Sequence, residues 1–405
     1  MNGAGDHSRG TGRAAGDAAH PDRDTAHPGR DDRVDEPGGR ATGPVRVLCA
    51  GDLFIRAAAL AAAARDALGD NTEVALLESR WPDDPFGAVD GVREAAGAPA
   101  DIAAAAAAAG ATVLLTHLAP VTRAVFEAAP GLRVVGVTRG GPVNADLTAA
   151  TDHGVPVVFL PGRNLGAVAE FTVGVMIALT RNVSAASRDL AAGRWDARWF
   201  RNELTGPELR TATVGLVGLG AVGLRVAELL RAFGSAVLAC DPYADPARAA
   251  ATGVRLVDFD ELLAASDIVS VHARLTDATR RMFDTAAFEK MKPNARFMNT
   301  ARGELVDRGA LLDALESGHL RGAALDVFDP EPPAPDDPLV ARADVIATPH
   351  LAGASEQVAS ESVTRVAREV AQFLRTGQLE HCANPGWVEH PRPGPRQPVG
   401  RRLGP

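Results

Sequence analysis

The sequence predicts an α/β protein composed of two domains, each built around a parallel β-sheet. Short apolar runs of strand length alternate with helical segments from residue 45 onwards, and this alternation is typical of parallel sheets. The chain has 405 residues, a length that suggests two or three domains. Hydrophobic residues make up 46% of it, which is enough for cores of substantial size.

The charge and the cysteine content argue against several classes of protein. The formal net charge is -9, so nucleic acid is not an expected partner. The three cysteines, Cys49, Cys240 and Cys382, lack the spacing of a zinc site or of a disulfide framework. No apolar stretch is long enough to span a bilayer and no secretory signal is visible, so we expect a cytoplasmic protein with no membrane partner.

The first predicted α/β unit covers residues 45–160. Residues 1–44 precede it and contain almost no large apolar side chains, so we expect them to form a disordered extension. Within the unit, strands are expected at 45–49, 74–77, 112–115, 132–137 and 155–160, and helices at 53–68, 102–109 and 121–128.

The second predicted unit covers residues 161–349. It opens with a helix at 164–182 that is ringed by apolar residues, so we expect this helix to be buried between the domains. Strands are expected at 213–218, 236–240, 254–256, 268–271, 296–299, 323–325 and 345–347. A long helix at 357–374 lies in the segment 350–382, and residues 383–405, rich in Pro, Arg and Gly, are expected to form a disordered tail.

A glycine-rich turn follows the first strand of the second unit. Its sequence is Gly218-Leu219-Gly220-Ala221-Val222-Gly223, and the amphipathic helix 224–233 comes directly after it. The first glycine allows a tight turn, the second lets the backbone approach a pyrophosphate, and the third lets the helix pack on the strand. The N-terminus of the helix offers free N–H groups to phosphate. Together these features predict a Rossmann dinucleotide site.

Asp241 ends the next strand and selects between the two nicotinamide cofactors. A carboxylate at this position accepts hydrogen bonds from ribose hydroxyls and repels the additional phosphate of NADP. The residues that follow, Pro242 to Ala244, offer no arginine to bind that phosphate. The sequence therefore favours NAD.

Three further motifs follow strands of the second unit, where open α/β sheets place their active sites. Asn-Thr-Ala-Arg-Gly presents Arg302, a cation suited to gripping a carboxylate. Leu-Asp-Val-Phe-Asp-Pro-Glu-Pro presents Glu331, and Pro-His-Leu-Ala-Gly presents His350, a residue type suited to acid–base chemistry. A cation, a titrating imidazole and a carboxylate to orient it form a complete set for hydride chemistry.

In this order, the four motifs resemble those of the D-isomer-specific 2-hydroxyacid dehydrogenase family, which includes phosphoglycerate dehydrogenases and glyoxylate or hydroxypyruvate reductases. The resemblance covers about residues 45–382. It implies a Rossmann NAD-binding domain (residues 161–349) inserted in a smaller, flavodoxin-like α/β substrate domain (residues 45–160 and 350–382). It also implies a homodimer, to which helix 164–182 and the stretch 188–199 would contribute.

The resemblance also implies a role for each motif residue. Arg302 would bind the substrate carboxylate, His350 would act as acid–base, and Glu331 would be the carboxylate partner of His350. Direct hydride transfer between NAD(H) and a 2-oxo or 2-hydroxy acid would follow, with no metal ion required. The residues expected at the cofactor are Gly218, Gly220, Ala221, Val222, Gly223, Asp241, His272, Ala273, Thr300, Ala301, Asp326 and His350.

The substrate loop departs from the common form of the family. Arg139, Gly140 and Gly141 are expected to bind substrate, the glycines through their N–H groups and Arg139 as an additional cation. Arg163 could supply a third cation, and Arg274 stands where the family usually has proline. We therefore hypothesise a substrate with a second anionic group, such as 3-phosphoglycerate; hydroxypyruvate is the plainer candidate. The alternative is that Arg139 pairs with a local carboxylate.

Two other functions are compatible with these motifs. One alternative is a dehydrogenase of a phosphonate- or phosphite-type anion. Another is an NADH-sensing scaffold like the corepressors built on this fold, because a fold alone does not determine function. A formate dehydrogenase is disfavoured, because that branch has glutamine where this chain has Glu331.

Overall fold

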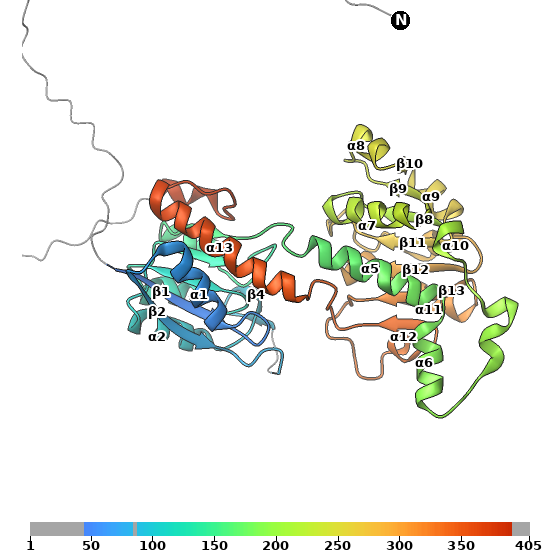
Figure 1. Cartoon of the computed structure of the whole chain (residues 1–405), viewed down its shortest axis with the longest axis horizontal. Coiled ribbons are helices and arrows are strands. Elements are labelled where there is room, and N and C mark those ends of the chain that lie inside the picture. Colours follow the sequence, from blue (N-terminus) through green and yellow to red (C-terminus); the bar gives the residue numbers. More distant parts are fainter. Residues whose placement is uncertain (1–43, 84–86, 391–405) are drawn as a thin grey trace, which may run out of the picture. The chain divides into compact units, whose positions relative to one another are not determined.

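The computed structural model describes residues 44–83 and 87–390 (Figure 1). Residues 1–43 of the expected N-terminal extension, and residues 391–405 of the expected tail, lie outside this description. The described chain contains two parallel sheets and one short hairpin. We call residues 44–164 with 353–390 the first lobe and residues 165–350 the second lobe, and we describe each by itself.

The first lobe contains a five-stranded parallel sheet. Its strand order is β2 (Thr72–Glu78), β1 (Val45–Gly51), β5 (Val113–Thr116), β6 (Val134–Val137) and β7 (Val157–Val158). Because the order reverses between β1 and β5, this sheet has the flavodoxin-like arrangement. Its helices are α1 (Ala57–Leu68), α2 (Pro99–Ala108), α3 (Arg123–Ala128), α4 (Leu147–Asp152) and α13 (Glu356–Thr376).

Helix α13 belongs to the first lobe although it lies at the far end of the chain. It packs against α1 and against strands β6 and β7. Val363, Val366 and Val370 join the core on this side of the sheet, and this apolar stripe at helical spacing explains the docking. Ser355 caps the helix by accepting a hydrogen bond from the backbone N–H of Val358 (3.1 Å).

Residues 383–390, expected to belong to a disordered tail, are ordered. Residues 385–389 form a short 3-10 helix, η5 (Pro385–Glu389). Asn384 is buried, accepts a hydrogen bond from the Val157 N–H (2.8 Å) and donates one to the Val155 carbonyl (2.9 Å). Trp387 packs edge-on against Phe373. A side-chain amide that satisfies an edge strand orders this segment, and composition alone does not reveal such a contact.

The second lobe contains a seven-stranded parallel sheet. Its strand order is β10 (Arg255–Leu256), β9 (Ala236–Cys240), β8 (Thr213–Val217), β11 (Ile268–Val271), β12 (Ala295–Asn299), β13 (Leu320–Leu325) and β14 (Val345–Ala347). This is the Rossmann order, with the reversal between β8 and β11. Its helices are α5 (Leu165–Thr180), α6 (Val183–Ala191), α7 (Ala221–Ala232), α8 (Pro246–Ala251), α9 (Phe259–Ala265), α10 (Thr285–Lys290), α11 (Arg308–Glu316) and α12 (Pro338–Ala341), with 3-10 turns η1 (Ala197–Phe200), η2 (Asn202–Leu204), η3 (Leu209–Thr211) and η4 (Gly303–Leu305).

Helix α5 corresponds to the expected helix 164–182, but its position differs from the expectation. It packs on α7 and on β13 of the second sheet, and Ala169, Val173 and Met176 lie in the core of that lobe. Glu170 and Gly174 on the same helix are exposed. The helix therefore covers one sheet and is not enclosed, although its sequence is apolar on most sides.

Two local differences concern the first lobe. The expected helix 53–68 begins only at Ala57, because Asp52 accepts the backbone N–H groups of Phe54 and Ile55 and holds residues 52–55 in a turn. The hairpin β3 (Gly87–Val89) with β4 (Val92–Ala95) lies in a stretch where no strand was predicted.

Among the described residues, no helix has the length and apolar character needed to cross a membrane.

Candidate active site

All the chemical motifs of the second lobe follow the carboxyl ends of its strands. The glycine-rich turn follows β8, the Arg302 loop follows β12, the Glu331 loop follows β13, and His350 follows β14. Because these strands are parallel and adjacent, the four loops emerge at one edge of the sheet. The sheet topology therefore brings together motifs that lie far apart along the chain.

The three glycines of the fingerprint each have a distinct structural reason. Gly218 has φ +99°, and a Cβ placed there would come within 2.7 Å of the backbone of His272 and Ala273. Gly223 packs so closely on the Gly218 carbonyl that a side chain cannot fit. At Gly220 a Cβ would meet no protein atom within 4 Å.

The open space at Gly220 lies at the N-terminus of α7. Gly220 is the N-cap residue, and no side chain among the described residues accepts the first N–H groups of this helix. Those N–H groups and the positive end of the helix dipole suit a pyrophosphate. The residues present therefore fit a dinucleotide, with Gly220, Ala221 and Val222 at its phosphates.

Asp241, expected at the ribose of that dinucleotide, lies against the glycine-rich turn. Its Oδ2 accepts the Leu219 N–H (2.8 Å), so the carboxylate is tied to the glycine-rich turn, and its Oδ1 accepts the Tyr243 N–H (2.9 Å). A carboxylate oxygen can accept more than one hydrogen bond, so each has capacity left for a hydroxyl group. This geometry fits the expected preference for NAD.

His272 and Ala273 lie directly against the glycine-rich turn. The Ser270 hydroxyl lies 3.0 Å from Nε2 of His272, and burial lowers the pKa of this histidine to about 4. His272 is therefore neutral at physiological pH. His272 lies beside Gly218, as expected for a residue that borders the cofactor, and its role there is structural.

Asn299, a buried residue at the end of β12, shapes the loop that presents Arg302. Its Oδ1 accepts the Ala301 N–H (3.0 Å) and its Nδ2 donates to the Arg302 carbonyl (2.8 Å). Thr300 meets Thr172 of α5 through their hydroxyls (3.2 Å). The side chain of Arg302 is exposed, and its only hydrogen bond within the described chain goes to the Ala301 carbonyl (2.6 Å). A fixed backbone thus carries a guanidinium with free donors.

His350 and Glu331 form a hydrogen-bonded pair. Nδ1 of His350 lies 2.6 Å from Oε1 of Glu331. The pKa of His350 is raised from its usual value, first because of the hydrogen bond to Glu331 and less because of the charge of Asp326; burial and the charge of Arg302 act in the opposite direction. The pair leaves Nε2 as the atom that can exchange a proton with a ligand.

Asp326 supports the turn that carries His350. This buried carboxylate accepts hydrogen bonds from the Thr348 hydroxyl (2.6 Å) and from the N–H groups of Leu351 and Ala352 (both 2.9 Å). His350 itself has φ +50°, a left-handed conformation that costs energy for a residue with a side chain. The three hydrogen bonds around it hold this conformation. Asp326 was predicted at the cofactor, and its partners within the protein are those of a brace.

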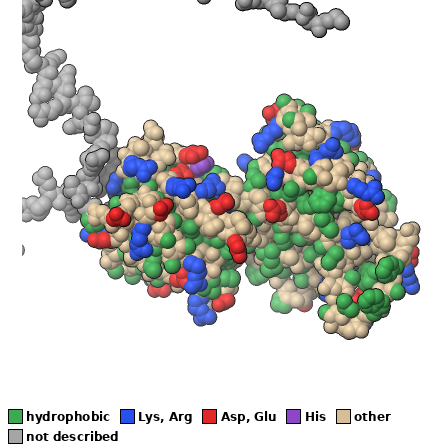
Figure 2. All heavy atoms as spheres, in the orientation of Figure 1, with side chains coloured by type: hydrophobic (Ala, Val, Ile, Leu, Met, Phe, Trp, Pro, Cys, Tyr) green, Lys and Arg blue, Asp and Glu red, His purple; other side chains and the backbone are tan. Residues whose placement is uncertain are grey.

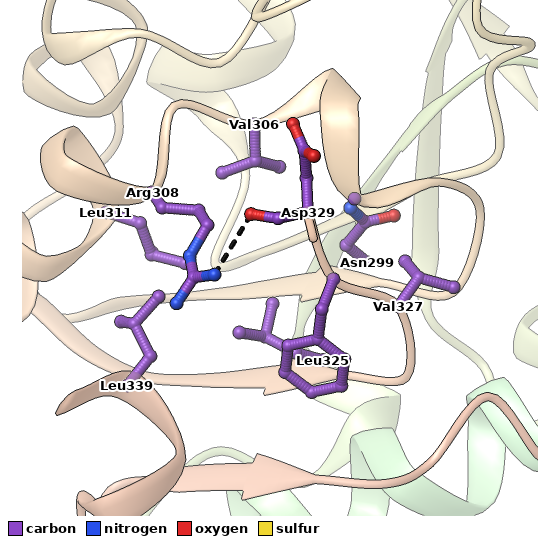
Figure 3. A pocket seen from close by; sticks show the side chains of 10 residues that line it. Asn299, Val306, Arg308, Leu311, Leu325, Val327, Asp329 and Leu339 are labelled. Atoms are coloured by element: carbon purple, nitrogen blue, oxygen red, sulfur yellow. Dashed lines mark hydrogen bonds between the residues drawn. The ribbon is translucent and has the colours of Figure 1, made fainter. Parts of the chain in front are cut away.

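Arg308 of α11 attaches the Glu331 loop to this helix. It lies beside a small pocket lined mainly by apolar side chains such as Leu311, Leu325 and Leu339 (Figure 3). Its Nη1 donates to the Asp329 carbonyl (3.0 Å) and its Nη2 pairs with the buried Asp337. Both ends of segment 329–337 are thereby tied to one guanidinium. Neither Asn299 nor Arg308 was predicted from the sequence, because their partners are mostly backbone groups.

The predicted substrate-binding residues of the first lobe follow β6. Nη2 of Arg139 pairs with Glu94 (2.6 Å), so the local carboxylate considered as an alternative is present. The N–H groups of Gly140 and Gly141 donate to no acceptor in the described part of the chain. Arg274 of the second lobe is exposed, and its carbonyl accepts a hydrogen bond from the Thr279 hydroxyl (2.7 Å).

Comparisons with known proteins agree with this architecture. The model of the D-isomer specific 2-hydroxyacid dehydrogenase NAD binding domain matches residues 173–352. The chain is 38% identical over 260 residues to D-3-phosphoglycerate dehydrogenase of Archaeoglobus fulgidus, covering 64% of this chain and 49% of the relative. It is 43% identical over 265 residues to D-3-phosphoglycerate dehydrogenase 2, chloroplastic, of Arabidopsis thaliana, covering 65% and 42% respectively. The solved structure of TT0316 protein from Thermus thermophilus aligns with a TM-score of 0.68 at 29% identity, covering 83% of this chain and 99% of that one.

The fold and the second-lobe site define an α/β protein with a dinucleotide-binding domain that carries a histidine–carboxylate pair. More specifically, residues 173–352 match the NAD binding domain of the D-isomer specific 2-hydroxyacid dehydrogenases, and the chain is similar to D-3-phosphoglycerate dehydrogenases. This confirms the family resemblance, the Rossmann fold and NAD as the cofactor. The chain spans about half the length of the curated relatives it matches.

Proposed function

We propose that this protein is an NAD-dependent dehydrogenase of D-2-hydroxy acids that also reduces the corresponding 2-oxo acids. The observation that carries the proposal is the His350–Glu331 pair, held at the same sheet edge as Arg302 and the dinucleotide turn. An acid–base, its orienting carboxylate and a free guanidinium are the groups that carbonyl reduction of a 2-oxo acid requires.

Each of these groups has one task. When bound, NADH supplies the hydride. Arg302 binds the substrate carboxylate with its free N–H groups and polarises the neighbouring carbonyl. Protonated His350 donates from Nε2 to the carbonyl oxygen as negative charge develops there, while Glu331 accepts from Nδ1 and stabilises the imidazolium. In the oxidative direction, neutral His350 accepts the hydroxyl proton.

His350→Asn tests this proposal more cleanly than an alanine variant. Asparagine tolerates the left-handed backbone at position 350 better than most residues, so the turn is retained while the acid–base is lost. We expect NADH oxidation with 2-oxo acids to slow by about 10²- to 10⁴-fold while NADH still binds, as measured by its fluorescence. Tight NADH binding by the unaltered protein with no turnover of any 2-oxo acid would contradict a dehydrogenase and favour a sensing role.

We further propose a homodimer formed through the second lobe. Val183 and Leu190 on α6, and Trp195 and Phe200 after it, are all more than half exposed, and Trp195 and Phe200 are 85% and 87% exposed. Figure 2 shows hydrophobic side chains gathered on the end of the second lobe that carries α6. Exposed apolar groups of this kind mark interfaces. Trp195→Ser with Phe200→Ser should lower the mass measured by light scattering from two chains to one; an unaltered mass would contradict this interface.

A further inference from the structure

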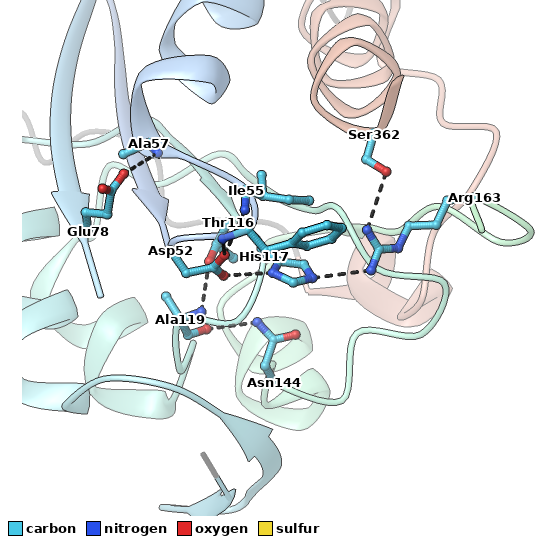
Figure 4. A network of polar contacts seen from close by, with 11 residues as sticks. Asp52, Ile55, Ala57, Glu78, Thr116, His117, Ala119, Asn144, Arg163 and Ser362 are labelled. Atoms are coloured by element: carbon cyan, nitrogen blue, oxygen red, sulfur yellow. Dashed lines mark hydrogen bonds and ion pairs between the residues drawn. The ribbon is translucent and has the colours of Figure 1, made fainter. Parts of the chain in front are cut away.

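The first lobe carries a second group of polar side chains at the reversal point of its own sheet (Figure 4). Asp52 follows β1 and His117 follows β5, the two strands between which the order β2-β1-β5-β6-β7 reverses. Parallel α/β sheets bind ligands in the crevice at this point. Neither residue belongs to the Arg302, Glu331 and His350 group.

Asp52 and His117 are locked together in the interior. Their side chains are 1% and 4% exposed, and Oδ2 of Asp52 lies 2.7 Å from Nδ1 of His117. Oδ1 of Asp52 is used by the N–H groups of Phe54 and Ile55. The rings of Phe54 and Trp81 lie 5.6 and 5.7 Å from the imidazole, so the orientation of His117 is set on several sides.

The outer nitrogen of this histidine holds Arg163. Nη2 of Arg163 lies 3.3 Å from Nε2 of His117. A guanidinium only donates, so Nε2 must accept and the proton of the neutral ring must sit on Nδ1, facing Asp52. Burial lowers the pKa of His117, which keeps the ring in this neutral form.

A tight turn places Arg163 at this position. The Arg163 N–H donates to the Leu160 carbonyl (3.3 Å), and Gly162 at the third position of the turn has φ +72°. Proline at the second position and a glycine with positive φ at the third are the signature of a type II turn. The sequence Leu160-Pro161-Gly162-Arg163 thus directs the guanidinium back across the sheet edge, where Ser362 of α13 lies 3.5 Å from Nη1.

Among the described residues, no carboxylate contacts the charge of Arg163 directly, because Asp52 reaches it only through His117. Burial and the nearby charge of Arg139 lower the pKa of Arg163 to about 10. On Arg139 itself, Glu94 satisfies Nη2, whereas Nη1 is buried without a hydrogen-bond partner in the part of the chain that the structure describes. Two neighbouring guanidinium groups therefore share one directly bonded carboxylate, and a buried donor is left unsatisfied.

We propose that Arg163, positioned by the Asp52–His117 pair, acts with Arg139 to bind a second anionic group on the 2-oxo acid substrate, either a phosphate or a carboxylate. This inference rests on the proposed dehydrogenase function and adds the substrate class. An oxyanion between the two guanidinium groups neutralises their mutual repulsion and offers an acceptor to the unpaired Nη1. A hydroxyl group in its place offers an acceptor but no charge, and an alkyl group offers neither, so the site discriminates by charge.

Binding without turnover gives the first test. Matched pairs differ only in the second anion: 3-phosphoglycerate against glycerate, and 2-hydroxyglutarate against 2-hydroxyvalerate. We expect one doubly anionic compound to bind at least tenfold more tightly than its partner by calorimetry, and which pair responds separates phosphate from carboxylate. Equal affinities within both pairs would overturn the inference.

Variants then assign the effect to Arg163. Arg163→Met should remove at least tenfold of the preference for the doubly anionic compound, and Arg163→Lys should restore part of it, because lysine keeps the charge without the fork. His117→Gln keeps an acceptor for Arg163, whereas His117→Leu does not, so only the leucine variant should raise the KM with little effect on kcat. Arg123→Met removes an exposed arginine of the same lobe that pairs with Asp152, and it should alter none of these values.

The outcomes separate this inference from the function on which it rests. Turnover of singly charged 2-oxo acids with no gain from a second anion, or a gain that survives in Arg163→Met, contradicts the anion site and leaves the dehydrogenase standing. Binding of the doubly anionic compound that depends on Arg163, with no NAD-dependent turnover, contradicts the dehydrogenase and leaves the anion site standing.

Discussion

Oε1 of Glu331 lies 2.6 Å from Nδ1 of His350, although 19 positions separate the two residues along the chain. This contact is the main cause of the raised pKa of His350, and it determines the pH range in which the imidazole can donate a proton. Reduction requires the protonated ring, so the reductive rate should fall as pH rises through the pKa of His350. Oxidation requires the neutral ring and should rise over the same range.

Glu331→Gln should shift both pH profiles toward lower pH. Glutamine removes the negative charge that favours the imidazolium, so the pKa of His350 decreases and the reductive limb falls at a lower pH than in the unaltered protein. We expect kcat for reduction at pH 8 to drop by about 10-fold or more, and for oxidation to drop less. Steady-state rates from pH 5 to 9 provide the measurement, and superimposable profiles would show that Glu331 does not control His350.

Arg308→Ala should produce a weaker form of the same change. The variant frees the Asp329 carbonyl and the Asp337 carboxylate, so the segment that carries Glu331 loses both attachments to α11. The expected result is a several-fold lower kcat with a pH profile moved toward that of Glu331→Gln. A merely structural role would lower stability without moving the profile; Arg308→Lys, which keeps the ion pair, is the matched control.

Asp326→Asn should destabilise the protein as well as slow it. The buried carboxylate accepts two N–H groups and one hydroxyl, and an amide has a single acceptor oxygen for them. The lost hydrogen bonds are worth about 2 kcal/mol, measured as the free energy of unfolding in urea. Because they hold His350 in its left-handed conformation, kcat should fall too, and unchanged stability would rule out the bracing role.

Asp241→Ala should reduce the discrimination between the two nicotinamide cofactors. The carboxylate repels an additional phosphate and accepts hydrogen bonds from ribose hydroxyls. Its loss should therefore weaken the binding of NADH and strengthen that of NADPH. We expect the ratio of the two dissociation constants, from fluorescence titration, to fall by about 10-fold or more. Tyr243→Phe, a change on an exposed neighbouring side chain, should leave the ratio as it is.

Much of the second lobe was predictable because its signals are local. A glycine that needs φ +99° beside a crowded backbone, an aspartate at a strand end and three short motifs after strands are all visible along the chain. The strands were predicted within a few residues for the same reason, since buried parallel strands appear as continuous apolar runs. The hairpin 87–95 was missed because its residues are mostly exposed and lack such a run.

Interactions between distant segments were the ones that composition could not indicate. Asn384 orders the segment 383–390 through backbone groups more than 220 positions away, and a polar, proline-rich sequence gives no sign of it. Arg139 was expected at the substrate with a local carboxylate as the alternative, and the structure places Glu94 on it while leaving Nη1 unpaired. The role of Asp52 and His117 was likewise invisible, because each residue alone resembles an ordinary buried polar group.

The sequence by itself determined the alternation of strands and helices around the two parallel sheets, the dinucleotide turn, the choice of NAD and the identity of the three residues suited to catalysis. These depend on side-chain periodicity and on backbone conformations that only certain residues adopt. The tertiary structure alone decided which carboxylate pairs with which cation and how His350 is held. It also decided that Arg163 hydrogen-bonds to a neutral histidine. Such relationships arise when parallel strands align their carboxyl ends, which brings together loops whose separation along the chain carries no information about their distance in space.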